Sequence, residues 1–113
     1  MDSPVGNETM DSDVMQLGGN IELSGFSEFD GATMIVLKKV IGNYARKIAD
    51  NHPTFKKLSI HVKKVHEREK SEKYEITVRC DAERLYPSDV VDRNLFFAVD
   101  SALKKILHEM GHQ

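Results

Sequence analysis

The sequence predicts an α+β domain with the element order β-α-β-β-β-α, in which a four-stranded sheet carries two helices packed on one face. Three observations lead to this fold class. Apolar residues recur at helical spacing in two stretches, and two stretches between them alternate apolar with polar residues as strands do. Each of these segments is apolar on one side only, so helices on a single face of the sheet would bury all the apolar sides together.

The N-terminal part of the chain divides into a tail and a first strand. Residues 1–18 are acidic and show no apolar period, which predicts a flexible acidic tail and leaves residues 19–113 for the domain. In "NIELSG", Ile21 and Leu23 alternate with polar residues, the pattern of a half-buried strand. The sheet is expected to begin with this strand.

A long amphipathic helix is predicted from about Ala32 to Asn51. Ser27 and Asp30 are two candidate caps for its start. The helix is expected to end before Pro53, because the residue that precedes a proline disfavours the helical conformation. Its apolar stripe consists of Met34, Leu37, Ile41, Tyr44, Ala45 and Ile48.

The next two segments are expected to form an antiparallel hairpin. "FKKLSIHVKKV" and "YEITVRC" both alternate apolar with polar residues, and the highly charged "HEREKSEK" connects them. This pattern puts Tyr74 and an inert thiol, Cys80, on the core face and leaves His61 outward, solvated or hydrogen-bonded. A short fourth strand is expected around Arg84 to Val91, at a sheet edge because Pro87 cannot donate a ladder hydrogen bond.

A second amphipathic helix is predicted for "NLFFAVDSALKKILHEM", with Gly111 ending it. The phenylalanines of this helix match core positions. Asp100 is expected to pair with a neighbouring cation such as Lys104, four residues further on. The apolar stripe consists of Leu95, Phe96, Val99, Ala102, Leu103, Ile106 and Met110.

Composition narrows the function classes. The 113 residues suit one domain, and no apolar run approaches the roughly 20 residues that span a bilayer. The N-terminus lacks the basic start and apolar run of a secretion signal. Cys80 is the only cysteine, so no intramolecular disulfide can form and a reducing compartment is expected. Together these features predict a cytoplasmic protein.

Charge is distributed unevenly along the chain, although the net charge is only -2. Residues 1–31 contain seven acidic residues and no Lys or Arg, whereas residues 35–73 contain eleven basic and four acidic residues. A basic stretch of this kind is either a footprint for a polyanion or a solvated face, and charge alone leaves both interpretations open. On the first helix, Lys39, Arg46 and Lys47 share one stripe opposite the apolar stripe.

Three segments of the chain resemble a known family. "NIELSG", "EKYEITVRC" and above all "NLFFAVDSALKKIL" resemble the ribosome hibernation promoting factors and ribosome-associated translation inhibitors. The last helix of that family begins with a D-L-Y-A-A-I-D type of motif followed by D-K-L. Residues 94–100 match the first part and residues 104–106 the second, and the resemblance covers roughly residues 19–110.

The resemblance implies a fold, a partner and a mode of action. Members fold as β-α-β-β-β-α, a topology similar to the double-stranded-RNA-binding domain, and the short members consist of this one domain. They bind the small ribosomal subunit and its rRNA in the channel for mRNA and tRNA, which inhibits translation and holds ribosomes in hibernation under stress. The resemblance therefore implies a non-enzymatic protein without cofactor, metal, small-molecule substrate or membrane partner, monomeric off the ribosome. Whether it pairs ribosomes stays open.

A general structured-RNA-binding module without ribosome specificity is the alternative. Phosphate contacts depend on positive charge and its position and need no catalytic geometry. With Tyr74 and the phenylalanines of the last helix expected in the core, few rings remain for base stacking, which favours recognition of RNA shape and backbone. The candidate RNA- and ribosome-binding residues are Lys38, Lys39, Arg46, Lys47, Lys57, Lys63, Lys64, Arg68, Arg79, Lys104 and Lys105.

A zinc-protease pattern, H-E-x-x-H, also occurs between His108 and His112. A protease of this kind needs a third protein ligand, an open metal position and a cleft that holds a peptide. The pattern falls in the last six residues, and Gly111 favours ending the helix before the second histidine. A metalloprotease is therefore the least favoured function, while incidental zinc binding by the two histidines is left open.

Overall fold

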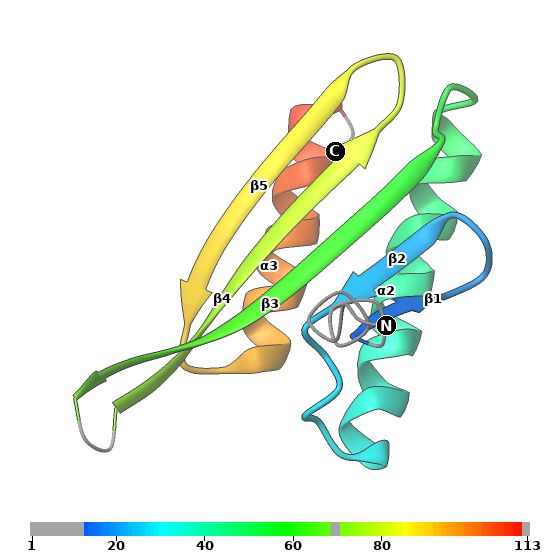
Figure 1. Cartoon of the computed structure of the whole chain (residues 1–113). Helices are drawn as coiled ribbons and strands as arrows, with labels where there is room; N and C mark the ends of the chain where they lie inside the picture. Colours follow the sequence, from blue (N-terminus) through cyan, green and yellow to red (C-terminus); the bar gives the residue numbers. More distant parts are fainter. Residues whose placement is uncertain (1–12, 69–70, 112–113) are drawn as a thin grey trace, which may run out of the picture.

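The computed structural model describes residues 13–68 and 71–111. Within these residues it is an α+β domain with a five-stranded mixed sheet and two helices, which confirms the predicted class (Figure 1). The elements in chain order are β1 Val14–Gln16, β2 Ile21–Ser24, α2 Gly31–Asn51, β3 Lys57–Arg68, β4 Ser71–Asp81, β5 Leu85–Asp92 and α3 Leu95–Glu109.

The strands lie side by side in the order β1-β2-β3-β4-β5. β2 and β3 are parallel, with Leu23 opposite Ile60, and α2 makes the crossover between them. The other neighbouring pairs are antiparallel. β5 is an edge strand, as Pro87 predicted, because a proline within a ladder leaves one hydrogen bond unmade.

The fifth strand corrects the predicted count of four. β1 pairs antiparallel with β2, with Met15 opposite Leu23, and its residues fall inside the 1–18 stretch predicted as a tail. The connecting turn contains Gly18 and Gly19 at positive φ, which glycine adopts without the steric cost that a Cβ brings. Three residues with one partly buried side chain are too few for a recognisable strand pattern. Residues 1–12 lie outside the described part of the chain.

Both helices cover the same face of the sheet (Figure 1). The apolar side of the central strands faces the helices. It packs against the apolar stripes of α2 and α3 to form one core. Each fully buried Leu or Ile contributes roughly 2 kcal/mol relative to an exposed one, so this single core dominates the stability of the fold. Residues with under 2% exposure include Leu37, Ile41, Ile48, Leu58, Ile60, Ile76, Val78, Leu103 and Ile106.

Caps fix where the two helices begin. The Asp30 carboxylate accepts the Thr33 N–H at 2.8 Å, so Asp30 rather than Ser27 caps α2. At the start of α3, the side chain of Asn94 accepts the Phe97 N–H at 3.0 Å. Within the described residues, neither helix combines the length and the apolar character that crossing a membrane requires.

The phenylalanines of α3 correct a second prediction, because they lie outside the core. The buried positions of this helix follow a stripe from Leu95 through Val99 to Leu107. At 100° per residue that stripe leaves Phe96 on its flank and Phe97 pointing away from it. Phe96 is 41% exposed and Phe97 is 56% exposed.

Candidate nucleic-acid interface

The eleven basic residues that the sequence singles out lie on different surfaces of the molecule. Six of them are exposed on the helix layer, the outward surface of α2 and α3, and these are Lys38, Lys39, Arg46, Lys47, Lys104 and Lys105. Three others, Lys57, Lys63 and Arg79, point to the open face of the sheet, opposite the helices. The predicted set is therefore divided between two opposite surfaces.

The last two candidates occupy the far end of β3. Lys64 is exposed there, and its ammonium lies 3.3 Å from the Glu28 carboxylate. The two groups form a hydrogen bond, and this bond is the main cause that raises the pKa of Lys64 above its ordinary value. Arg68 belongs to β3, but its side chain falls outside the described part of the structure.

Acidic residues accompany the cations of the open sheet face. Lys57 is 2.6 Å from Glu22, and the hydrogen bond from Lys57 lowers the pKa of that carboxyl. The ladder register puts Lys63 opposite Glu75. The Arg79 guanidinium donates to the carbonyl oxygen of Val78 at 3.0 Å. The open face is thus a mixed surface whose cations have acidic or carbonyl neighbours.

The helix layer differs in that, within the described residues, Lys104 alone of its six cations forms an ion pair, although Asp50 and Glu109 follow Arg46 and Lys105 by four residues. Among the described residues, Lys39, Arg46 and Lys105 form no ion pair, and neither does Lys38. Lys104 pairs with Asp100 at 3.5 Å, the i,i+4 pair that the sequence predicts, while its side chain stays 70% exposed. An exposed pair of this kind is worth only about 0–1 kcal/mol, so Lys104 can leave Asp100 for a stronger anion.

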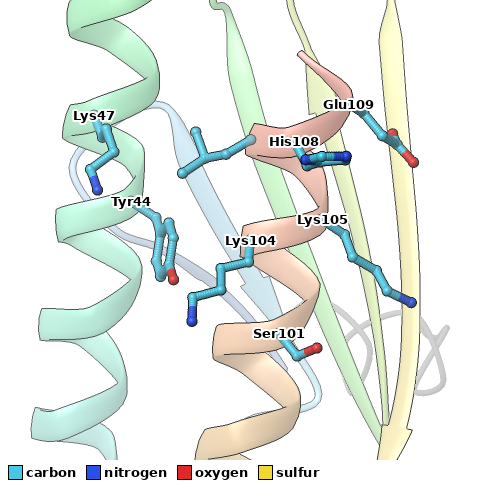
Figure 2. Close-up of a pocket in the computed structure, with 8 residues that line it drawn as sticks. Tyr44, Lys47, Ser101, Lys104, Lys105, His108 and Glu109 are labelled. Carbon is cyan, nitrogen blue, oxygen red and sulfur yellow. The ribbon is translucent and has the colours of Figure 1, made fainter. Parts of the chain in front are cut away.

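An open groove of about 610 Å³ lies along α3 beside α2. Tyr44 and Lys47 line it from α2, and Lys104, Leu107 and His108 line it from α3. Figure 2 shows Lys47 and Lys104 on either side of the Tyr44 ring, one cation from each helix. The groove therefore has an apolar and aromatic floor between two ammonium groups, and Lys105 and Glu109 complete its charged lining.

Tyr44 and Asp100 join the two helices at this groove. The Tyr44 hydroxyl donates to the Asp100 carboxylate at 2.6 Å, although the two residues are 56 positions apart in the sequence. Burial is the largest cause that raises the pKa of Tyr44, and the hydrogen bond to Asp100 adds to it, so the phenol stays protonated. The Lys47 ammonium lies 6.0 Å from the centre of the Tyr44 ring.

This contact holds together the two helices that carry the cations on either side of the groove. Asp100 holds both the Tyr44 hydroxyl and the Lys104 ammonium, and Tyr44 packs beside Lys47. The sequence pattern assigned Tyr44 to the apolar stripe alone. Its helical position, on the flank of that stripe, is the signal that could have indicated a second role.

The two histidines of the H-E-x-x-H pattern lie one helical turn apart only in a helix that continues through both of them. α3 ends at Glu109, with His108 exposed in its last turn. Gly111 has φ 83°, a left-handed conformation that ends the helix between Met110 and His112. His112 itself is outside the described residues. Among the residues that are described, no group of three or more His, Cys, Asp or Glu side chains is placed to hold a metal ion.

A second hollow, of about 450 Å³, lies at the end of β2. His61 borders it, exposed as predicted, with Nδ1 2.8 Å from the Ser24 hydroxyl oxygen. Its charges are mixed, because the lining includes both Lys64 and its partner Glu28. This hollow offers a phosphate fewer unpaired cations than the groove on the helix layer does.

No protein-family model matches the chain, and a search among curated proteins finds no relative. The resemblance to ribosome hibernation factors therefore stays a prediction from the residues that carry it.

Proposed function

We propose that this chain is a short ribosome hibernation factor, which binds rRNA of the small ribosomal subunit through its helix layer. Bound in the channel for mRNA and tRNA, it inhibits translation without any reaction chemistry. The observation that carries this proposal is the groove in which Lys47 and Lys104, from two different helices, face the solvent from either side of Tyr44.

The physical basis is the attraction of phosphates to fixed, unpaired cations. Each ammonium or guanidinium that neutralises a phosphate releases a condensed counterion, which makes binding favourable at low salt. Lys39, Arg46 and Lys105 have exposed side chains beside this groove or on the outward stripe of α2. The helices that carry them are anchored by the core, so little conformational freedom is lost when RNA binds.

The choice of the ribosome as partner rests on the family resemblance. "NLFFAVDSALKKIL", the segment that matches best, forms most of α3 and contains both Asp100 and Lys104. In this chain Asp100 connects α3 with α2 by accepting the Tyr44 hydroxyl, and Lys104 pairs with Asp100 within α3. The best-matching segment thus includes the contact that organises the candidate RNA surface.

A general structured-RNA-binding module is the second candidate. The order of its elements, a sheet with two helices on one face, is similar to the double-stranded-RNA-binding domain. A module of that kind recognises the shape and backbone of a duplex and needs few base contacts. The same helix-layer cations would serve it.

Sedimentation through a sucrose gradient at physiological salt tests the ribosome proposal. We expect the protein to co-migrate with small subunits, and bound mRNA and tRNA to displace it because they occupy the same channel. Replacing Lys39 and Arg46 together by Glu should remove the protein from the subunit fraction. A matched variant with Lys63 and Arg79 replaced by Glu, on the open sheet face, should still co-migrate.

A binding titration separates the two candidates. The ribosome proposal predicts tighter binding to small subunits than to an arbitrary RNA duplex of equal charge. Equal affinity for both would favour the general module. Absence of binding to either at low salt would contradict both candidates.

A further inference from the structure

The start of α3 exposes two adjacent aromatic side chains that the core does not use. Phe96 is 41% exposed and Phe97 is 56% exposed. The Phe97 N–H is held by the Asn94 cap, so its backbone position is fixed while its ring faces solvent. A single exposed apolar residue is ordinary on a protein surface, but two exposed aromatic residues in succession at a capped helix start call for an explanation.

Phe97 shares one stripe of α3 with the cations at its other end. Ser101, Lys104 and His108 follow Phe97 at offsets of four, seven and eleven residues, which lie on the same side of an α-helix. Figure 2 shows these three later residues in succession along the outward part of α3. Seven residues correspond to about 10 Å along the helix axis, so Phe97 and Lys104 are within reach of one short ligand.

α2 repeats this arrangement. Val36 is 46% exposed and shares an outward stripe with Lys39, Asn43 and Lys47, at offsets of three, seven and eleven residues. The two helices run in the same direction, so both apolar ends lie at the same end of the helix layer (Figure 1). On each helix an exposed apolar side chain therefore precedes a groove cation, Lys104 on α3 and Lys47 on α2, and Lys38 and Lys39 also lie near Val36.

We propose that Phe97 is a stacking platform for an unpaired RNA base, next to the phosphates that Lys47 and Lys104 bind. This inference rests on the proposed RNA-binding function and names the RNA class more closely, as a duplex with an adjacent single-stranded segment. A ring offers its face to any base, so the contact tolerates different sequences. The roughly 10 Å between Phe97 and Lys104 corresponds to about three nucleotides of a stacked strand.

Charge complementarity favours RNA over other occupants of the start of α3. Phe97 shares its stripe with Lys104, whose pair with Asp100 is exposed and weak, so a partner that brings both a ring and an anion fits this stripe better than a purely apolar one. RNA supplies both parts of the match, since its bases have apolar faces and its backbone is anionic. A second copy of the chain would instead bring the same cations together.

Fluorescence anisotropy with two RNAs tests the platform. One is a blunt RNA duplex, and the other is the same duplex with a short single-stranded tail that contains 2-aminopurine. We expect Phe97→Ala to weaken binding of the tailed RNA about tenfold, to leave the blunt duplex unchanged, and to abolish 2-aminopurine quenching. Phe97→Trp should restore both affinity and quenching, because it retains a ring.

Leu85→Ala is the matched control, since Leu85 is 57% exposed on β5 and belongs to the other surface. It should bind both RNAs like the unmodified chain. The salt dependence of tailed-RNA binding should be the same in Phe97→Ala, because no phosphate contact is removed.

Other outcomes overturn the proposal in distinguishable ways. An equal loss for both RNAs would overturn the platform, because Phe97 would then support duplex binding rather than stack on an unpaired base. No loss for the tailed RNA would also overturn the platform, while duplex binding by the cations would remain. A concentration-dependent dimer that Phe97→Ala converts to monomer would identify a second copy as the occupant. Failure of the unmodified chain to bind either RNA would contradict the proposed function along with the platform.

Discussion

The helix layer and the open sheet face both carry basic residues, but they differ in the acids that accompany them. On the sheet face Lys57 is 2.6 Å from Glu22 and Lys63 lies opposite Glu75. On the helix layer Arg46 and Lys105 are exposed and, in the described part of the chain, without an ion pair. A cation that already has an acid gains less from a phosphate, so the position of the acids decides which lysines can bind RNA.

The largest expected effect comes from charge reversal on the helix layer. Replacing Arg46 and Lys47 by Glu removes two exposed cations of α2 and adds two anions, and Lys47 lines the groove. We expect RNA affinity to fall about a hundredfold at physiological salt, since contacts to charged groups contribute roughly 1.5 kcal/mol each. A filter-binding titration over a range of salt concentrations measures it, together with the flatter salt dependence that fewer phosphate contacts produce.

The contrast between the two surfaces would be wrong if charge reversal on the sheet face lowered RNA affinity as much as it does on the helix layer. Replacing Lys63 and Arg79 by Glu makes the same formal change of charge on the opposite surface. We expect affinity to change by no more than about twofold, from the long-range field alone. A hundredfold loss in this variant would mean that RNA contacts both faces.

A smaller effect is expected from the contact between the helices. Tyr44→Phe removes the 2.6 Å hydrogen bond to Asp100 and keeps the ring. The free energy of unfolding should fall by about 1 kcal/mol, and RNA affinity should fall severalfold because α2 and α3, which carry Lys47 and Lys104, lose the hydrogen bond that joins them at the groove. Urea denaturation and anisotropy measure the two quantities.

Tyr86→Phe provides the matched comparison. Tyr86 is buried on β5, and its hydroxyl donates to Glu83 at 3.1 Å, away from the groove. This variant should lose a similar amount of stability and bind RNA normally. If the two variants changed RNA affinity equally, Tyr44 would act through stability alone.

The strands differ in how well they could be predicted from the sequence. β3 and β4 were recognisable because their apolar residues alternate over many positions, such as Leu58, Ile60 and Val62. β1 was not, because only Met15 of its three residues packs against the core. Local periodicity therefore predicts an element only where several side chains share one environment.

The candidate site was less predictable because its decisive contacts are distant in the sequence. Tyr44 and Asp100 are 56 residues apart, and Lys57 forms its ion pair with Glu22, which lies on a different strand. Periodicity assigns a residue to a face but does not identify its neighbour across elements. Phe96 illustrates the related limit at the edge of an apolar stripe, where one helical step separates a core position from an exposed one.

The smallest expected effect concerns the ion pair on the sheet face. Because Lys57 lowers the pKa of Glu22 in the folded chain, the pair stabilises the fold above the ordinary carboxyl pKa of 4.5. This contribution is lost as pH falls through the lowered folded value, where Glu22 becomes protonated. Glu22→Gln should therefore reduce stability at pH 7 by at most about 1 kcal/mol, with little effect at pH 2, in denaturation curves at the two pH values.

RNA binding by Glu22→Gln then distinguishes two explanations of why the sheet face is not the RNA surface. If the ion pair alone prevents Lys57 from binding phosphate, the variant should gain affinity, because Lys57 is half exposed and would be released. If the helix layer makes the contacts, affinity should stay within about twofold, since the charge change lies on the far side of the core. We expect the second result, because the groove on the helix layer has Lys47 and Lys104 on either side of Tyr44, whereas the hollow beside Lys63 is also lined by Glu28 and Glu72.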